Sequence, residues 1–343
     1  MSKNNIIVTG GLGFIGFNLV KKLIEKKFFV IIIDKITYAA NKKNLQYLNK
    51  KNYKFYNFDI INKKKLIKTI VKYKPNCIFN LAAETHVDQS INFPKKFITT
   101  NIYGVFNILE ALKEIKDKYR TITKLIQVST DEVYGDIKRK KFSKESDRYF
   151  PSSPYSSSKA SGDLIIFSYI RTFKIPAIVT NCCNNFGPGQ NKEKLIPKII
   201  SCLKKNKNLP IYGKGKNQRE WIFVEDHCEA LLKIMNKGKL GEQYNIGSGN
   251  VYDNIFIAKS ILNLYKKKFN NKCKSKIIFV KDRPGHDFRY ALNSNKIKKE
   301  LNWYPIIKFY NGLETTFLWY FKNKNYYKKL NLKDIIIRQG KKW

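Results

Sequence analysis

The chain has 343 residues, of which 43% are hydrophobic and 14% aromatic. This content can build a sizeable core, which excludes a wholly disordered chain, and the length predicts two domains. Lys and Arg number 67 against 26 Asp and Glu, a formal net charge of +41. The basic residues are scattered along the chain and form no recognition motif. This pattern favours a solvated basic surface that attracts phosphorylated ligands over a nucleic-acid-binding surface.

The six cysteines and three histidines predict neither a disulfide framework nor a zinc site. No two cysteines form a C-x-x-C pair, and the histidines lie far apart in the sequence, whereas structural zinc sites need closely spaced ligands. Reduced, buried thiols are expected instead. The N-terminus has no signal-peptide pattern, and the longest apolar run, 28–33, is too short to span a bilayer. We therefore expect a cytoplasmic protein that binds neither metal nor membrane.

Up to residue 180, short apolar runs alternate with longer amphipathic ones. Strands are predicted at 6–8, 29–33, 53–58, 77–81, 124–128 and 177–180. Helices are predicted at 17–26, 66–73, 97–118 and 154–173. Such alternation is typical of a parallel, doubly wound α/β sheet.

Beyond residue 181 the alternation loosens, and glycine and proline become frequent. This change predicts a doubly wound domain at 1–182 followed by a smaller, mixed α/β substrate domain at 183–325. An apolar segment near 220–236 is expected to return to the main sheet. The remainder, 326–343, is interpreted as a basic tail on the surface.

A glycine-rich turn joins the first strand to the first helix. Gly11, Gly13 and Gly16 fit G-x-G-x-x-G, while Gly10, Gly13 and Gly16 fit the G-x-x-G-x-x-G variant equally well. In either pattern, a turn without side chains lets a pyrophosphate approach the N–H groups at a helix N-terminus. Asp34 ends the second strand, where a carboxylate binds a ribose 2′-hydroxyl and repels a 2′-phosphate. The pattern predicts a Rossmann-type domain that binds NAD rather than NADP.

Tyr155 and Lys159 lie four positions apart in a predicted helix, so their side chains share one face. The charge of Lys159, together with a bound nicotinamide cation, is expected to lower the pKa of Tyr155 towards neutrality. Such a tyrosinate can take the proton of a sugar hydroxyl while the carbon gives a hydride to NAD. The Y-x-x-x-K pattern is common by chance, and its value here comes from following the dinucleotide turn.

Three polar residues, Thr130, Asp131 and Glu132, follow the fifth predicted strand, at the sheet edge where such folds place their chemistry. Thr130 can hydrogen-bond a reacting hydroxyl. Two neighbouring carboxyls in a closed site repel each other, so one should hold its proton as an acid while the other acts as a base. Elimination of water requires such a pair. The alternative interpretation of the two acids is a solvated loop or a helix N-cap.

Together these motifs resemble those of the extended short-chain dehydrogenase/reductases and, more narrowly, of the dTDP-glucose 4,6-dehydratases. Thr-Asp-Glu is the specific part of the resemblance, because enzymes acting on other sugar nucleotides share the glycine turn and Y-x-x-x-K. The resemblance covers about residues 4–320 and rests on the segments 10–16, 82–88, 129–135, 155–159, 184–188, 193–197, 219–221, 224–227, 244–247 and 282–287.

The resemblance implies a redox-neutral reaction in three stages. Tyr155 takes the proton of the glucose 4-hydroxyl while the C4 hydride passes to NAD. Glu132 then removes the C5 proton, and Asp131 protonates the departing 6-hydroxyl. The hydride finally returns to C6, which gives the nucleotide-bound 4-keto-6-deoxyglucose and regenerates an NAD that is expected to stay bound.

The resemblance also implies the contacts of both ligands. The catalytic residues are Thr130, Asp131, Glu132, Tyr155 and Lys159. Cofactor contacts map onto Gly10, Gly13, Phe14, Ile15, Gly16, Asp34, Lys35, Thr37, Asp59, Ile60, Leu81, Ala82, Ala83, Thr100, Tyr155, Lys159 and Asn185. Sugar-nucleotide contacts map onto Thr85, Thr130, Asn184, Lys194, Leu195, Pro210, Ile211, Tyr212, Arg219, Asn254, Asp282, Arg283, Pro284, Gly285 and His286. Of these, Arg219 and Arg283 suit a diphosphate, because a guanidinium fork matches phosphate oxygens.

Four positions depart from the family pattern. Gln89, Asn181 and Phe288 stand where arginine is usual, and Phe186 where tyrosine is common. A UDP-glucose 4,6-dehydratase therefore stays open as an alternative. A UDP-sugar epimerase or decarboxylase is a further alternative, although an epimerase has no water to expel. A catalytically inactive NAD-binding scaffold is the alternative outside the enzymes.

The two longest predicted helices, 97–118 and 154–173, offer more apolar surface than one contact with a sheet should cover. Related enzymes pair these helices with their copies in a second subunit, so a homodimer is expected. The side chains assigned to this surface are Phe106, Leu109, Ile115, Leu164, Ile165, Phe167, Ser168 and Tyr169.

Overall fold

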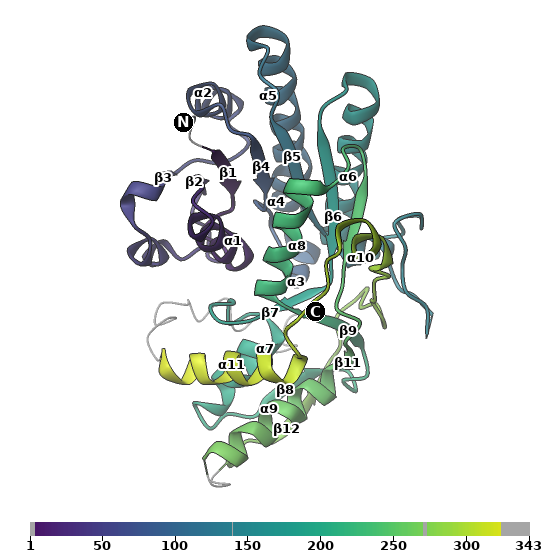
Figure 1. Cartoon of the computed structure of the whole chain (residues 1–343). Helices are drawn as coiled ribbons and strands as arrows, with labels where there is room; N and C mark the ends of the chain where they lie inside the picture. The colour runs from purple at the N-terminus through teal and green to yellow at the C-terminus, as the bar shows by residue number, and fades with distance from the viewer. Residues whose placement is uncertain (1–3, 139, 270–272, 324–343) are drawn as a thin grey trace.

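A parallel seven-stranded sheet forms the centre of the larger domain in this computed structural model, which describes residues 4–138, 140–269 and 273–323 (Figure 1). The expected basic tail at 326–343 lies outside the described residues. In space the strands follow the order β10-β6-β5-β4-β1-β2-β3, and every pair is parallel. Their bounds are β1 (Asn5–Thr9), β2 (Phe29–Ile33), β3 (Tyr53–Tyr56), β4 (Cys77–Asn80), β5 (Lys124–Thr130), β6 (Ala177–Cys182) and β10 (Gln243–Ile246).

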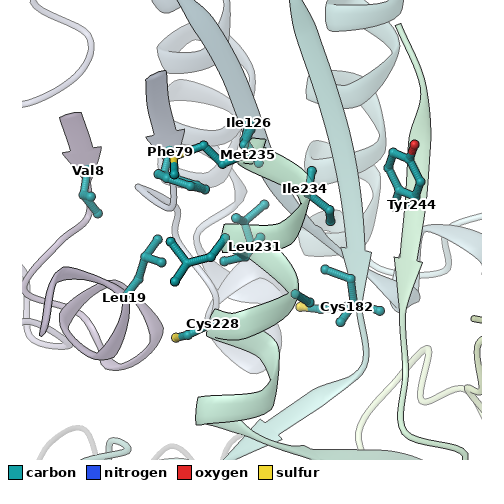
Figure 2. Packing of buried hydrophobic residues seen from close by; sticks show 14 of the residues in the cluster. Val8, Leu19, Phe79, Ile126, Cys182, Cys228, Leu231, Ile234, Met235 and Tyr244 are labelled. Atoms are coloured by element: carbon teal, nitrogen blue, oxygen red, sulfur yellow. The ribbon is translucent and has the colours of Figure 1, made fainter. Parts of the chain in front are cut away.

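Helices cover both faces of this sheet, which explains why its strands are near-continuous apolar runs. On one face lie α1 (Phe14–Glu25) and α8 (Val224–Lys237), and Figure 2 shows Leu19 of α1 and Leu231 of α8 among side chains of the sheet. The other face is covered by α2 (Lys63–Tyr73), α5 (Gly104–Tyr119) and α6 (Pro154–Phe173). The predicted doubly wound, Rossmann-type sheet is therefore confirmed.

The strand order reverses between β1 and β4, which are neighbours in space although β2 and β3 separate them in the sequence. Connections from the two strands leave in opposite directions, so their carboxyl ends open a crevice between them. In open α/β sheets this reversal is where ligands bind. The topology thus places the glycine turn after β1 opposite the loop after β4.

The smaller domain lies below the large sheet in Figure 1 and is built from two short sheets with helices around them. The three-stranded sheet has the order β11-β9-β7, and the two-stranded sheet pairs β12 with β8. A separate apolar cluster, which includes Trp221 and Phe309, holds these elements together. Their bounds are β7 (Asn184–Phe186), α7 (Leu195–Leu203), β8 (Leu209–Tyr212), β9 (Gln218–Phe223), β11 (Val251–Asp253), α9 (Asn254–Lys268), β12 (Ile277–Val280) and α11 (Phe309–Lys322). The short helix α10 (Asn295–Leu301) packs instead on the core of the large sheet, through Ile297 and Leu301.

The helix predicted over 97–118 is interrupted. The chain forms α4 (Pro94–Phe97), a wide π-helical turn η3 (Ile98–Tyr103) and then α5. Within the turn, the Asn101 side chain accepts a hydrogen bond from Glu84 N at 2.9 Å and donates to Ser158 Oγ at 2.9 Å. Such turns recur at functional sites, and this one holds the helix against the loop after β4. The other short elements are η1 (Lys42–Tyr47), η2 (Lys50–Asn52), α3 (Val87–Asn92) and η4 (Asp131–Tyr134).

The chain returns to the large sheet first as a helix, α8, and then as a strand, β10. Within the predicted segment 220–236, β9 belongs to the three-stranded sheet, and only α8 packs on the large one. The strand that rejoins the large sheet is β10, which pairs in parallel with β6 and was not predicted. Its four residues include the polar Gln243 and Asn245, so no continuous apolar run marks it.

Two residues assigned to the exposed helical surface are buried. Leu109 and Ile115 are fully covered and belong to the apolar cluster between α5 and the sheet. They point inward because the helical period places them with Val105 and Leu112 on the sheet-facing side. None of the helices among the described residues is long and apolar enough to cross a membrane.

Candidate active site

A cleft of about 420 Å³ lies over the carboxyl ends of the strands at the order reversal, and the smaller domain forms its other wall. All residues predicted to contact the cofactor line it. Of the residues predicted to contact the sugar nucleotide, Asp282, Pro284 and Gly285 are not in the lining. Of the predicted catalytic residues, only Asp131 does not line the cleft. Positions far apart in the sequence are thus brought into one cleft.

The glycine turn has the geometry of an anion site. Gly10 has φ +65°, and a Cβ there would lie 2.7 Å from the backbone N of Ala82. A Cβ on Gly16 would collide with the Gly10 carbonyl oxygen. Gly13 is the N-cap of α1 and supplies no side-chain cap, so the free N–H groups of the first turn can bind a phosphate.

The two glycine registers left open by the sequence can be separated by position. Gly10, Gly13 and Gly16 line the cleft, whereas Gly11 does not. A Cβ on Gly11 would instead lie 2.9 Å from the Ile32 side chain on β2. Gly10, Gly13 and Gly16 therefore form the ligand-facing turn, and Gly11 allows the turn to pack against the sheet.

The carboxylate of Asp34 is held in place at the end of β2. Its Oδ2 accepts a hydrogen bond from Leu12 N at 3.0 Å, and its Oδ1 accepts one from Ile36 N at 2.8 Å. Burial raises the pKa of Asp34, while these two bonds and the charge of Lys35 lower it. Each carboxylate oxygen keeps a lone pair for a ribose hydroxyl.

Lys35 could in principle attract a 2′-phosphate, but its charge is already compensated. Its Nζ lies 3.2 Å from Asp59 Oδ2 and 3.4 Å from Glu84 Oε1, and it donates to Thr100 Oγ1 at 3.1 Å. The ribose end of the cleft therefore presents carboxylates rather than a free cation. This arrangement fits NAD, whose ribose carries hydroxyls only.

Tyr155 and Lys159 lie on α6, which begins where Ser153 forms a capping box with Ser156. The Lys159 Nζ donates to Val128 O at 2.8 Å, so the helix is joined to β5. The pKa of Tyr155 lies well above its usual value. Burial raises it most, the charge of Glu132 raises it further, and a hydrogen bond with Thr130 lowers it. The direction is opposite to the expected lowering, because burial and the charge of Glu132 disfavour the tyrosinate more than Thr130 favours it.

The acid pair is divided by its surroundings. Asp131 is 2% exposed, its Oδ1 accepts from Thr130 Oγ1 at 3.1 Å, and its Oδ2 has no hydrogen-bond partner among the described residues. Burial, then the charges of Glu132 and Glu220, hold the pKa of Asp131 well above its usual value. A solvated loop is excluded by this burial. Asp131 is thus suited to carry a proton at neutral pH.

Glu132 faces the cleft from the same turn, but its charged neighbours differ from those of Asp131. Burial raises the pKa of Glu132, but the charges of Arg283, Arg219 and Lys194 lower it. Three cations from the smaller domain therefore favour its ionised form. The pKa values of both carboxyls are raised, but only Glu132 meets three cations, so the surroundings favour a proton on Asp131 over one on Glu132.

The two arginines differ in what they can offer a diphosphate. Arg219 stacks at 4.2 Å on the Tyr290 ring and donates through Nη1 and Nη2 to backbone carbonyls of residues 218, 287 and 288. Arg283 lines the cleft, donates through Nη1 to Asp88 and keeps an Nε without a hydrogen-bond partner among the described residues. Arg283 is therefore the better candidate for a phosphate contact.

Sequence reasoning missed Asp163, one helical turn after Lys159. Asp163 is fully buried, and its Oδ2 accepts a hydrogen bond from Ser129 Oγ. Burial raises the pKa of Asp163 to about 7, against the charge of Lys159 and the hydroxyls of Ser129 and Tyr149, which lower it. The spacing of Tyr155, Lys159 and Asp163 at every fourth residue of one helix was the available signal.

The departures from the family pattern avoid the reacting groups. Asn181 is a buried residue of β6, next to β5, where it donates to Thr130 O at 3.1 Å and accepts from Gln243 at 2.8 Å. Phe186 lies in the apolar core of the smaller domain. Among the described residues, no group of histidine, cysteine and acidic side chains could hold a metal ion.

Comparison with known proteins places these features in one family. The family model described as GDP-mannose 4,6 dehydratase matches residues 7–316. A dTDP-glucose 4,6-dehydratase of Neisseria gonorrhoeae is 41% identical over 335 residues, which cover 94% of this chain and 97% of that protein. The corresponding protein of Haemophilus influenzae is 42% identical over 335 residues, covering 94% and 99%.

Solved structures agree with these relatives. A dTDP-glucose 4,6-dehydratase of Bacillus anthracis in complex with NAD superposes with a TM-score of 0.84 at 40% identity, covering 94% of this chain and 98% of that one. A dTDP-glucose 4,6-dehydratase of Streptomyces venezuelae, also with NAD bound, gives a TM-score of 0.88 at 35% identity, covering 94% and 99%. The chain therefore belongs to the dTDP-glucose 4,6-dehydratase family.

Proposed function

We propose that the chain is an NAD-dependent hydro-lyase that converts dTDP-glucose into dTDP-4-keto-6-deoxyglucose and water. The observation that carries this proposal is the pair of buried Asp131 and half-buried Glu132 at the end of β5, near Tyr155. An epimerase needs the tyrosine and the cofactor, but it has no use for a proton donor placed against a leaving hydroxyl. The relatives and solved structures of the family support the same activity.

The first step is the oxidation at C4. Bound NAD supplies the acceptor that takes a hydride from the sugar and later returns it. Tyr155 takes the proton of the 4-hydroxyl, and the Thr130 hydroxyl orients that group. Lys159, held by the Val128 carbonyl, provides positive charge beside the tyrosine. The glycine turn and Asp34 would hold the cofactor over these residues.

The second step is the loss of water. The 4-ketone acidifies the C5 hydrogen, which Glu132 removes, while Asp131 gives its proton to the departing 6-hydroxyl. After the hydride has returned to C6, a proton is restored at C5. The balance is one water lost and no net change of oxidation state, so the cofactor need not leave between turnovers.

The choice of nucleotide can be tested directly on the purified protein. We expect 4-keto-sugar formation from dTDP-glucose to be at least about 10-fold more efficient in kcat/KM than from UDP-glucose, which corresponds to about 1.4 kcal/mol of discrimination. Product formation is followed by mass spectrometry, with GDP-mannose as a further comparison substrate. A reversed preference would assign the chain to a UDP-glucose dehydratase, and inactivity on all three would reject the reaction class.

Replacing Glu132 by Gln should separate oxidation from elimination. The glutamine keeps the shape of the side chain but cannot accept the C5 proton, so turnover should fall on the order of 10²–10⁴-fold. Oxidation at C4 should persist, and a 4-keto sugar that retains its 6-hydroxyl should accumulate in single-turnover mass spectra. Glu225→Gln on α8, which does not line the cleft, is the control. Normal turnover by Glu132→Gln would contradict the assignment.

Replacing Asp163 by Asn should alter the pH profile. Burial lowers the pKa of Lys159, and the charge of Asp163 raises it. With its pKa of about 7, Asp163 is ionised in the alkaline range, where Lys159 needs that support. Without this charge the pKa of Lys159 falls further, so the alkaline limb of kcat should move to lower pH, by about one unit. An unchanged limb, or one at higher pH, would contradict this role; Asp117→Asn, on the exposed side of α5, is the control.

A homodimer through α5 and α6 is a further part of the proposal. Ile98 and Tyr103 are 54% and 52% exposed, and Leu164 on α6 is 57% exposed. Phe106 stacks on Tyr103 and meets the edge of Tyr169, so the two helices share one apolar surface. An apolar surface of this kind on two long neighbouring helices is typical of a subunit interface.

Light scattering after size-exclusion chromatography tests the dimer. We expect a mass near twice that of one 40.2 kDa chain. Leu164→Arg places a charge in the apolar surface and should yield single chains with reduced activity, because α6 carries Tyr155. Leu318→Arg, at a 45% exposed leucine on α11, should leave the mass doubled. A wild-type mass of one chain at micromolar concentration would reject the interface.

We also infer that the protein works in the cytoplasm. Among the described residues all six cysteines are free thiols, and five of them are buried. Unpaired cysteines in this number are typical of proteins kept in a reducing compartment.

A further inference from the structure

Asp88 joins the two domains through a single buried carboxylate. It lies on α3, a short helix that follows β4, and it is 0% exposed. Its Oδ2 accepts a hydrogen bond from the Tyr212 hydroxyl at 3.0 Å, and its Oδ1 accepts one from Arg283 Nη1 at 3.0 Å. Both donors belong to the smaller domain, and both line the cleft.

The two donors come from one end of the same small sheet. Tyr212 is the last residue of β8, and Arg283 follows the end of β12, the parallel partner of β8. Val280 and Tyr212 are register partners in that sheet. One carboxylate of the larger domain therefore fixes both strands of the two-stranded sheet at the edge that faces the cleft.

The segment around Asp88 receives further contacts from the smaller domain. Lys194 Nζ donates to Thr85 O at 3.0 Å, and His86 Nε2 lies 3.8 Å from Glu193 Oε2. The chain from Thr85 to Asp88 is thus met by three separate segments of the opposite wall. Within this segment, Asp88 is a buried residue that forms an ion pair with an arginine, Arg283.

Arg283 needs this anchor because of the groups around it. Its side chain is 14% exposed, and the charges of Asp88 and Glu132 raise its pKa. Arg219 and His286 are the neighbouring cationic or titratable groups on the same wall. Without Asp88, the carboxylate left to attract the guanidinium would be Glu132, the base of the reaction. A pairing of these two would move the arginine and hold Glu132 as a salt bridge.

We propose that Asp88 is a positioning residue that holds Arg283 and Tyr212 for the diphosphate of the substrate and keeps Arg283 off Glu132. The proposal rests on the proposed function, since the diphosphate is that of the sugar nucleotide. Asp88 itself touches neither the sugar nor the cofactor. It acts on the substrate through the arginine and the tyrosine.

The test is Asp88→Asn in the full chain, with dTDP as the probe in isothermal calorimetry. The asparagine has the same shape, but it presents an N–H group in place of one acceptor oxygen and leaves Arg283 without its counter-charge. We expect dTDP to bind roughly 10- to 100-fold more weakly and KM for dTDP-glucose to rise. We expect kcat to fall as well, because Arg283 would then pair with Glu132, the proposed base. Retained NAD, measured in the denatured protein, should be unchanged.

A double-mutant cycle separates positioning from general damage. Arg283→Met should weaken dTDP binding, and Asp88→Asn added to it should cause only the smaller further loss that comes through Tyr212, since the arginine is already absent. Glu229→Gln breaks another ion pair, between Glu229 and Lys22 at 2.5 Å on α8 and α1, and should leave dTDP binding unchanged. Additive losses in the cycle, or unchanged dTDP affinity in Asp88→Asn, would overturn the proposal.

A second variant covers the case in which Asp88→Asn does not fold. Tyr212→Phe removes one of the two hydrogen bonds and leaves the ion pair intact, so a smaller loss of dTDP affinity in the same direction is expected. An unchanged affinity in Tyr212→Phe would then overturn the proposal. Failure of the wild-type protein to bind dTDP or to turn over any sugar nucleotide would instead reject the proposed function, and the Asp88 proposal with it.

Discussion

The hydrogen bond from Lys159 to the Val128 carbonyl joins the two elements that carry the chemistry. Lys159 lies on α6, and Val128 lies on β5, two residues before Thr130. A second buried contact, from Ser129 to Asp163, joins the same helix and strand. The tyrosine and the acid pair are thereby held in one rigid frame, because neither the helix nor the strand can move without breaking a bond in a dry interior. The cofactor turn and the smaller domain are arranged around this frame.

Electrostatics then gives different roles to groups of the same chemical type. Asp131 and Glu132 are adjacent carboxyls, but one is enclosed beside other acids and the other faces three cations. The cations come from the smaller domain, whereas the carboxyls come from the larger one. The difference in electrostatic surroundings between the two carboxyls is therefore a property of the assembled cleft. It does not belong to the Thr-Asp-Glu segment alone.

Local patterns in the sequence were sufficient for most of the fold, for the glycine turn and for the catalytic candidates, whereas most other residues of the cleft were implied by the family resemblance. The apolar runs of β1 and β2, and the Ser-Pro start of α6, identify their elements because the signal lies within the element itself. The strand β10 could not be found in this way, since its four residues owe their strand conformation to pairing with β6. Asp88 was missed for a related reason, because its partners Tyr212 and Arg283 lie far away in the sequence. Asp163 shares a helical face with Lys159, but its burial and its bond with Ser129 are not visible in the sequence. A buried charge is visible only when the surrounding structure is known.

The return of the chain to the large sheet has a mechanical consequence. After β6 the chain enters the smaller domain, comes back as α8 and β10, and then leaves again as β11 and α9. The two walls of the cleft are therefore connected by several segments of the chain that pass between the domains, rather than by one hinge. Such walls resist wide separation, and large opening would strain more than one connection at once. This suits a catalyst whose redox partner is restored in every cycle, because only the sugar nucleotide has to enter and leave.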